Sequence, residues 1–545
     1  IEEWLNQADA LLSQCQSVTD KVELNNVLIL YYGGAGQMNK AIDIALDSLR
    51  LFAMDLPRNP NQMQLLLELA RAKIVLGRKT ADELMRLPLY ASDNIDAIFS
   101  LLKELIAPTY LQGLTNLLPY IILRMFNLTL KYGNGPVASF AYSGYALLWS
   151  KLGDFAEAYR FGVLAMDYNK QVNNPPMEAR CYFMTTSFDL YWRQALKNSQ
   201  QHRKIGLQKL IDTGEYFWAS YIYLFGFWQE VVLSQSLDDI IELAKREIQF
   251  AQKAKQIEPY YVHTLHHNLF KNLAGQTQYP ELLDDQQGEE AQALAYFEQN
   301  TTSTMGKFYY AVCRLVLHYY YEQYAQALTV ATQPQITEAV ICDGTYTRVI
   351  YTFYTCLSIL ALASPAVKPA AVHADYAKRK QKIKQWYTLC PENFAVMWSL
   401  LVAEEARINE QDSRAIDYYE LALQAAKRNS SLWFESLVNE LTAKFWLHKS
   451  NQKIACVFMT EASYLYYRWG ALRKIAQLEK NYPDLLIRQQ TNLITKKITA
   501  DTDRYATTTT SGHGNETTLD IRTLLKAAQA LSGEIVMDKL LQKLM

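Results

Sequence analysis

The chain has 545 residues, of which 50% are hydrophobic and 20% are charged, and its formal net charge is −1. This is the composition of a folded chain, and the small net charge argues against attraction to nucleic acid or anionic lipid through an overall field. The sequence contains no run of about 18 uncharged apolar residues, the length that a transmembrane helix needs. Glycine (21) and proline (15) are scarce, so few positions interrupt helices. We expect an all-α fold with no nucleic-acid partner and no membrane partner.

The cysteines point to the compartment in which the chain works. There are seven of them, an odd number, and none forms a C-x-x-C pattern. This usage predicts reduced thiols and a cytoplasmic location. The chain opens with the acidic, amphipathic sequence IEEWLNQADALL, which is unlike a signal peptide. Because it begins without Met and stops inside a helical pattern, we expect it to be part of a longer protein.

The first helix pair is predicted within residues 1–56, around the sequence YYGGAGQ. Gly36 marks the turn, and Ala41, five residues later, is a small residue that lets the first helix approach the second. The glycines also resemble a phosphate-binding loop, but such a loop needs Lys and then Ser or Thr after its last glycine. Gln and Met occupy those positions here. An inter-helix turn is therefore the better interpretation, and residues 61–107 predict a further pair.

The clearest pair is formed by residues 140–165, FAYSGYALLWSKLGDFAEAYRFGVLA. It aligns with the 34-residue tetratricopeptide repeat (TPR), in which two helices meet at a glycine and pack through fixed bulky and small positions. Gly153 is the turn glycine in this alignment. Gly162 replaces the usual aromatic residue, so we expect a neighbouring helix or side chain to fill the space. The other packing positions are Tyr142, Tyr145, Ala146 and Trp149 in the first helix and Phe155, Ala158 and Ala165 in the second.

The same spacing recurs more weakly along the chain, giving about six recognisable pairs. The packing positions of the later pairs include Tyr324, Ala327, Ala415 and Ala455. A helix pair of this kind cannot bury its apolar face alone and must stack on its neighbours. We therefore predict an α-solenoid of stacked TPR-like pairs over residues 1–494, with a tyrosine-rich inner face. A division into two lobes near residues 276–288 stays open.

The pattern changes after residue 494. Residues 495–517 are polar and rich in threonine, which predicts a flexible linker. Residues 518–545 resume a helical pattern, which predicts a connector helix leading into a following domain. The apolar residues Ile521, Leu524, Ala528 and Leu531 have a short coiled-coil-like spacing. This spacing leaves open a homodimer through the connector helix.

Three histidines, His263, His266 and His267, lie three and four residues apart in the sequence YVHTLHHNLF. On a helix they share one face, so they could hold a metal and support an α-helical metal-dependent enzyme. No nearby Cys and no H-E-x-x-H pattern accompanies them. Packed and polar positions on an ordinary helix explain them more simply. We expect no metal, no cofactor and no catalytic residue in this chain.

Four stretches resemble one family of proteins. They are LKYGNGPVASFAYSGYALLWSKLGDFAEAYRFGVLAMD (130–167), WYTLCPENFAVMWSLLVAEEARI (386–408), ASYLYYRWGALRKIAQLEKNYPDLL (462–486) and LDIRTLLKAAQALSGEIVMDKLLQKLM (519–545). Together they resemble the central helical region of large multidomain bacterial signalling proteins, frequent in cyanobacteria. Those proteins carry a serine/threonine kinase domain, an AAA/STAND-type ATPase, a TPR-like region, a GAF domain and a histidine kinase. The sequences CPENF and YRWGA…KNYPDL carry most of the resemblance.

The resemblance implies a regulatory, protein-interaction scaffold that relays between an N-terminal kinase and ATPase part and a C-terminal GAF and histidine kinase part. It implies partners that are proteins or neighbouring domains of the same chain, and ATP bound only by flanking domains. The family's catalytic motifs are not found in this sequence, so we expect this segment not to be an enzyme. A stand-alone TPR-like scaffold is the main alternative. We expect Trp149 to serve chiefly in packing, so that its replacement by alanine unfolds the local pair.

Overall fold

The computed structural model describes residues 11–486, except 13, 16, 285–287, 301–302, 338–341 and 364–369. Residues 1–486 form one compact unit by their contacts. The regular elements of the described part are helices, apart from one isolated β-bridge between Leu89 and Asn134. The predicted all-α fold is confirmed. The predicted linker (495–517) and connector helix (518–545) lie outside the described residues.

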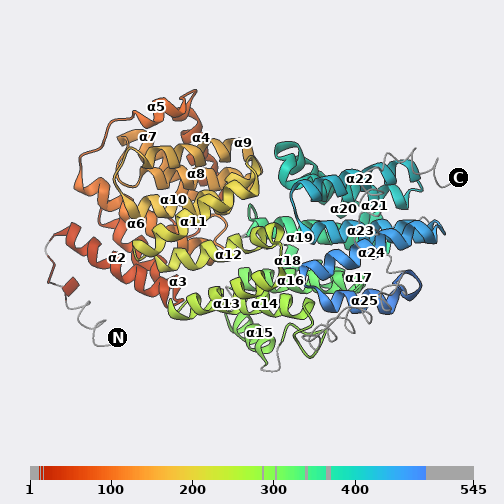
Figure 1. Ribbon diagram of the computed structural model, residues 1–545. Coiled ribbons are helices and arrows are strands. Elements are labelled where there is room, and N and C mark those ends of the chain that lie inside the picture. The colour runs from red at the N-terminus through yellow and green to blue at the C-terminus, as the bar shows by residue number, and fades with distance from the viewer. Residues whose placement is uncertain are drawn as a thin grey trace, which may run out of the picture. The chain divides into compact units, whose positions relative to one another are not determined.

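The helices follow one another with short connections (Figure 1). The first are α2 (Val18–Gly34), α3 (Met38–Arg50), α4 (Gln62–Leu76), α5 (Ala81–Met85), α6 (Asp93–Leu111), α7 (Leu117–Tyr132), α8 (Ala138–Leu152), α9 (Phe155–Asn169), α10 (Pro175–Phe188), the 3-10 helix η1 (Leu190–Trp192), α11 (Leu196–Asp212) and α12 (Tyr216–Leu233). The next are α13 (Leu237–Lys253), α14 (Ile257–Leu273), α15 (Glu289–Gln299), α16 (Thr304–Tyr320), α17 (Tyr324–Ala331) and α18 (Pro334–Thr337). The last are α19 (Tyr346–Leu362), α20 (Ala370–Leu389), α21 (Pro391–Ile408), α22 (Asp412–Arg428), α23 (Leu432–His448), α24 (Gln452–Trp469) and α25 (Leu472–Asn481). None of the helices in the described part is long and apolar enough to cross a membrane.

Successive helices pack in pairs, most extensively α8 with α9, α10 with α11, α13 with α14, α21 with α22 and α23 with α24. A small residue is the fourth residue of the second helix in many pairs, and its side chain is completely buried. These residues are Ala41 in α3, Ala158 in α9, Ala219 in α12, Ala327 in α17, Ala415 in α22 and Ala455 in α24. A methyl group at this point allows the first helix to approach closely, so the pairs stack as a TPR-like α-solenoid does.

The turns within the pairs explain why the repeat is hard to read in the later sequence. Gly36 and Gly153 have φ angles of 76° and 84°, in the left-handed region where glycine is favoured. The equivalent turns of the later pairs hold Glu322, Glu410 and Ser450, with φ angles of 61°, 57° and 58°. The backbone turn is therefore kept where the glycine is lost, and the sequence no longer marks it.

The array also has contacts between pairs that are far apart in the sequence, which an ideal solenoid lacks. Helix α12 contacts both α19 and α23, and α14 contacts α25. The side-chain amide of Asn393 donates to the carbonyl of Tyr191 at 2.6 Å, and the Ser431 hydroxyl donates to the carbonyl of Val232 at 2.7 Å. These bonds satisfy buried backbone carbonyls between segments about 200 residues apart, so they tie the early and late helices together.

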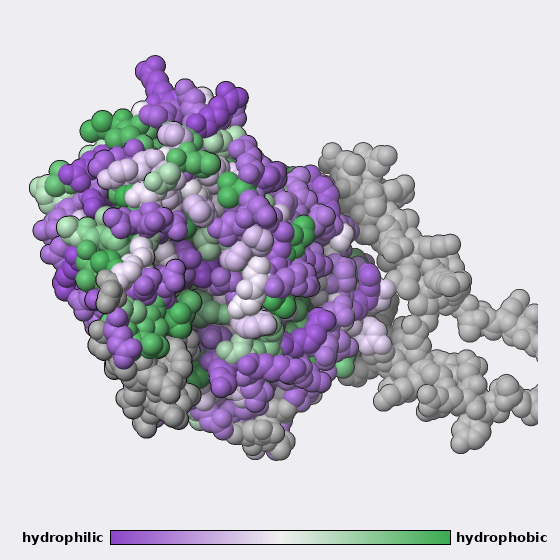
Figure 2. Space-filling model, turned by 90° about the vertical axis from the view of Figure 1, so that its left-hand side faces the viewer, coloured by the Kyte–Doolittle hydropathy of each residue, from purple (hydrophilic) through white to green (hydrophobic). Residues whose placement is uncertain are grey.

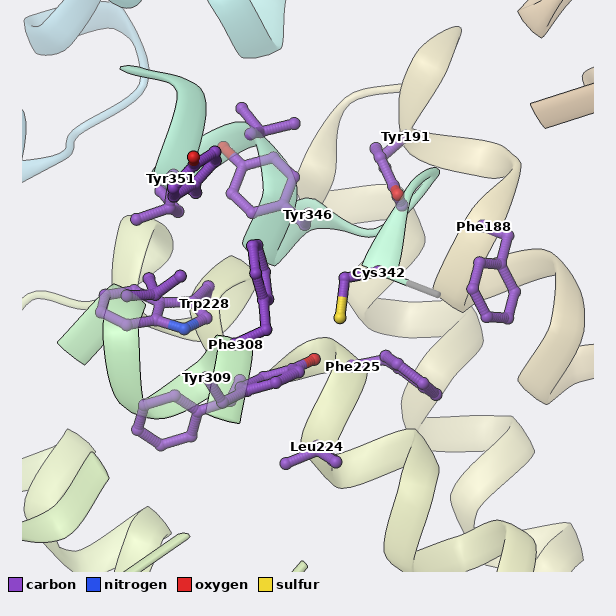
Figure 3. Close-up of a cluster of buried hydrophobic side chains, with 14 of the residues drawn as sticks. Phe188, Tyr191, Leu224, Phe225, Trp228, Phe308, Tyr309, Cys342, Tyr346 and Tyr351 are labelled. Carbon is purple, nitrogen blue, oxygen red and sulfur yellow. The ribbon is translucent and has the colours of Figure 1, made fainter. Parts of the chain in front are cut away.

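Aromatic side chains fill the space where early and late helices meet (Figure 3). Trp228 of α12, Tyr309 of α16 and Tyr346 of α19 lie in this cluster and are almost completely buried. Burying aromatic side chains of this size is a large hydrophobic contribution. Much of the tyrosine content therefore fills the core, where the sequence led us to expect a tyrosine-rich inner face.

Candidate interaction site

The side chains aligned with TPR packing positions in α8 are core residues in the structure. The Tyr145 ring stacks on Phe126 with 3.9 Å between ring centroids and meets Phe161 edge-on at 4.7 Å. Tyr142 is fully buried, and its hydroxyl donates to Asn134 Oδ1 at 2.8 Å. Ala146 and Ala165 are fully buried as well. Because these side chains are buried and the Tyr142 hydroxyl is bonded internally, these residues act in packing.

Trp149 and Phe155 lie at the edges of this core. Trp149 is partly buried, and its ring centroid lies 5.8 Å from that of Tyr145. The Nζ atom of Lys73 lies over the Trp149 ring, 5.2 Å from its centroid. Since Lys73 belongs to α4, Trp149 links α4 to α8. Phe155 packs against Trp192 with 4.1 Å between ring centroids. Tyr324, an aligned position of a later pair, is also partly buried against the core.

Gly162 makes room for a buried acid. A Cβ added at Gly162 would stand 3.0 Å from Oδ2 of Asp189, a residue that follows α10 and is completely buried. Neither carboxyl oxygen of Asp189 has a hydrogen-bond partner among the described residues. Burial raises the pKa of Asp189 well above its ordinary value. The sequence indicated a vacancy at Gly162, but nothing in it pointed to Asp189.

The three histidines have different environments, although the ring centroids of His263 and His266 lie 5.7 Å apart. His263 Nδ1 lies 2.9 Å from the Glu247 carboxylate, and both side chains are almost completely buried. The His266 ring stacks on Phe227 at 4.0 Å, and burial lowers its pKa well below the ordinary value. His267 is only half-buried. Among the described residues, no group of three or more His, Cys, Asp or Glu side chains could hold a metal ion. The geometry gives the metal-dependent alternative no support.

A buried ionic cluster joins the last three helices. Glu440 of α23 lies 2.9 Å from Lys474 of α25 and 2.7 Å from Lys444, and it accepts a hydrogen bond from the Tyr466 hydroxyl at 2.8 Å. Burial alone would raise the pKa of Glu440, but Lys444 and Lys474 hold it down at about 2. Lys474 also donates to the carbonyl of Tyr320 at 2.7 Å. All of these groups have protein partners, so the cluster is a structural joint.

An apolar pocket lies between α6, α10 and α12, with about 350 Å³ of empty space, part of it open to solvent. Aromatic side chains such as Phe183, Trp218 and Phe225 line it, and its exposed lining is apolar. Small-molecule sites usually combine an apolar wall with a few polar groups that fix orientation. This pocket is at the lower end of the usual size and no polar surface is exposed in it, so it is a weak candidate.

Helix α4 is the strongest candidate site, because its two sides are occupied in an unusual way. The side that packs against α7 carries Glu68, which is 4% exposed. This carboxylate accepts from Asn127 Nδ2 at 2.8 Å and lies 3.2 Å from Arg124, both on α7, and 2.8 Å from Arg71. The packed side of α4 also carries the partly buried Leu65 and Leu69 and the buried Ala72 and Leu76.

The opposite side of α4 presents large apolar side chains to solvent. Met63, Leu66, Leu67 and Ile74 are 65%, 60%, 55% and 78% exposed. The spacings of three, four and seven residues place them along one side of the helix. Hydrophobic residues also form patches in the upper part of the face in Figure 2, at the level of α4 and α5 in Figure 1. A helix with large apolar residues on opposite sides is normally buried, so among the described residues α4 lacks a cover.

The exposed charges on α4 have one sign. Arg71, Lys73 and Arg78 are exposed on its C-terminal half and just beyond it. Glu68 is the acid of this helix, and it is buried against α7. The outer side of α4 is therefore an apolar stripe with a cationic end. The sequence LLLELARAKIVL contained a sign of this, since its apolar residues occupy every side of a helix, but the TPR alignment did not use it.

Comparison with known proteins gives limited information. No known family model matches the chain. A stretch of 64 residues, 12% of the chain, is 36% identical to part of the hybrid signal transduction histidine kinase G of Dictyostelium discoideum. The matched stretch spans about 2% of that protein. Part of this chain is thus similar to a small part of a signal-transduction kinase.

Proposed function

We propose that this chain is a protein-interaction scaffold of a signal-transduction kinase and that it binds its partner through the outer side of α4. The observation that carries this proposal is the burial pattern of α4. The charged Glu68 is buried, whereas the apolar Met63, Leu66, Leu67 and Ile74 are exposed. The 36% identity to part of a hybrid histidine kinase supports the signalling context. In that context the chain relays between a kinase and ATPase part and a GAF and histidine kinase part, as the resemblance implies.

The exposed stripe can contribute a large share of the free energy of a protein contact. Burying a side chain such as Leu, Ile or Met contributes about 1.5–3 kcal/mol. Four such side chains offset a large part of the cost of association, which is about 4–15 kcal/mol. Contacts of the partner with the rest of α4 supply the remainder. Helix-to-helix docking through apolar residues spaced three and four apart is a common mode of protein recognition.

The relay is supported by the way the helices are joined. Buried bonds such as Asn393 to Tyr191 and Lys474 to Tyr320 connect helices that are distant in the sequence. Trp149 is in contact with α4 through Lys73 and with the α8 core through Tyr145. A partner bound at α4 would therefore act on a helix that is in contact with the packed core. Coupling between sites needs such a physically continuous set of contacts.

The test compares the full chain with the variant Leu67→Ser/Ile74→Ser as baits in a lysate of the source organism. Both changes replace exposed side chains and should leave the fold intact. The control is Leu421→Ser, which replaces an apolar residue that is 46% exposed in the middle of α22. We expect at least one protein to bind the parent chain and the control but not the α4 variant. Identical sets of bound proteins for all three baits would refute the proposal.

A further inference from the structure

The geometry points to an acidic amphipathic helix of another protein as the occupant of the outer side of α4. This inference rests on the proposed function and adds the chemistry of the partner. The apolar residues of the partner helix cover Met63, Leu66, Leu67 and Ile74, and its carboxylates face the cations at the C-terminal end of α4.

The length of the stripe sets the length of the partner helix. Met63 and Ile74 are 11 residues apart, which is about 16 Å or three turns of helix. A partner of about 11 to 14 helical residues covers this distance. Its apolar residues must recur at three- and four-residue intervals to interlock with those of α4. A shorter or extended segment would leave part of the stripe in water.

The charge on α4 sets the sign of the partner. Arg71, Lys73 and Arg78 are exposed near the end of the stripe, and the single buried acid Glu68 is shared between Arg71 and Arg124, at 2.8 and 3.2 Å. One carboxylate cannot balance these cations, so an excess of positive charge remains at this end of α4. An acidic helix gains from them both in association rate and in register, whereas a basic helix is repelled.

Two other occupants match the surface less well. A second copy of this chain would bring the same cations and no exposed acid on α4. An anionic bilayer is flat and would also meet Asp82 and Glu83, which are exposed on the neighbouring α5. A single helix is long and narrow, so it can follow the apolar stripe without spreading over the surface around it. These differences favour a helical protein partner.

The experiment measures binding of two synthetic fluorescent peptides to the full chain by anisotropy. Both peptides have 14 residues and the same leucines at three- and four-residue spacing, and their remaining positions are mainly Glu in one and Lys in the other. We expect the Glu peptide to bind, with at least tenfold weaker binding to Leu67→Ser/Ile74→Ser and unchanged binding to Leu421→Ser. Arg78→Glu should weaken the Glu peptide about two- to fivefold, as expected for one exposed charge contact. The matched control Arg428→Glu, at an exposed position of α22, should have no effect.

Each other outcome has a definite meaning. Equal binding of the Glu and Lys peptides, or binding of neither, overturns the acidic-helix inference. The proposed function still stands in that case if the lysate experiment depends on α4. Sedimentation of the chain with phosphatidylserine vesicles, if it is lost in Leu67→Ser/Ile74→Ser, would overturn the acidic-helix inference in favour of a membrane. Concentration-dependent dimerisation lost in the same variant would overturn it in favour of a second copy.

Discussion

Gly162 of α9 lies directly against Asp189, so a Cβ at position 162 would stand 3.0 Å from Oδ2 and 3.2 Å from Cβ of that residue. Both distances are shorter than ordinary van der Waals contact. Asp189 is completely buried and has little room to move. The small size of Gly162 in α9 is thus required by the buried side chain of Asp189, which follows α10.

We predict that Gly162→Ala destabilises the chain by about 1 kcal/mol. Alanine in place of a helical glycine gains about 0.5–1 kcal/mol, but the clash with Asp189 costs about 1–3 kcal/mol. The control is Gly144→Ala in α8, where a Cβ would meet Ile122 and Met125 at ordinary distances of 3.6–3.8 Å. Urea unfolding should show a loss for the first variant and none for the second. Equal effects at the two positions would argue against the contact.

Asp189→Asn should make the protein more stable than the parent at neutral pH. The pKa of Asp189 is raised in the folded state by burial, so folding favours the protonated acid. Stability from this group is complete below the unfolded pKa of about 3.9 and is lost as pH rises toward the folded pKa. The advantage of the Asn variant should therefore grow between pH 5 and pH 8, by up to about 1.4 kcal/mol per pH unit. Denaturant titrations at several pH values measure it, and a constant difference would contradict the prediction.

Glu440→Gln should cost about 3–5 kcal/mol at pH 7, because it leaves Lys474 without its buried counter-charge and Lys444 with Glu322 as its remaining acid, at 2.8 Å. The folded pKa of Glu440 is about 2, below the unfolded value of about 4.3. Its stabilisation is present above the unfolded pKa and is lost as pH falls through about 2. The gap between parent and variant should narrow in acid. Adding Lys474→Met should recover part of the loss at pH 7, and a strictly additive double variant would speak against the joint.

Tyr145→Ala should destabilise the chain more than Trp149→Ala. Tyr145 is 1% exposed and stacks on Phe126, so its removal leaves a cavity that costs about 3–5 kcal/mol. Trp149 is only partly buried, and we expect about 2 kcal/mol for its loss. Both effects appear as a lower unfolding midpoint in thermal or chemical denaturation. A Trp149→Ala variant with unchanged stability and lost partner binding would instead assign this side chain to recognition.

Local features of the sequence predicted the repeating part of the fold. The spacing from Gly153 to Ala158 identified a helix pair, and Ala327, Ala415 and Ala455 identified weaker ones. Helix periodicity and turn conformation act over a few residues, so a single chain reveals them. Turns at residues such as Glu322 escaped notice because a non-glycine residue adopts the positive φ angle there.

What the sequence by itself determined is the class of structure: helix pairs, with a small residue in the first turn of the second helix, that have to stack to bury their apolar faces. Only the tertiary structure decided which residues meet across the stack. The neighbour of Gly162, the counter-ions of Glu440 and the uncovered side of α4 all depend on helices that come together from distant parts of the chain. Helical periodicity marks which residues share one side of a helix, but burial and pairing depend on what packs against that side.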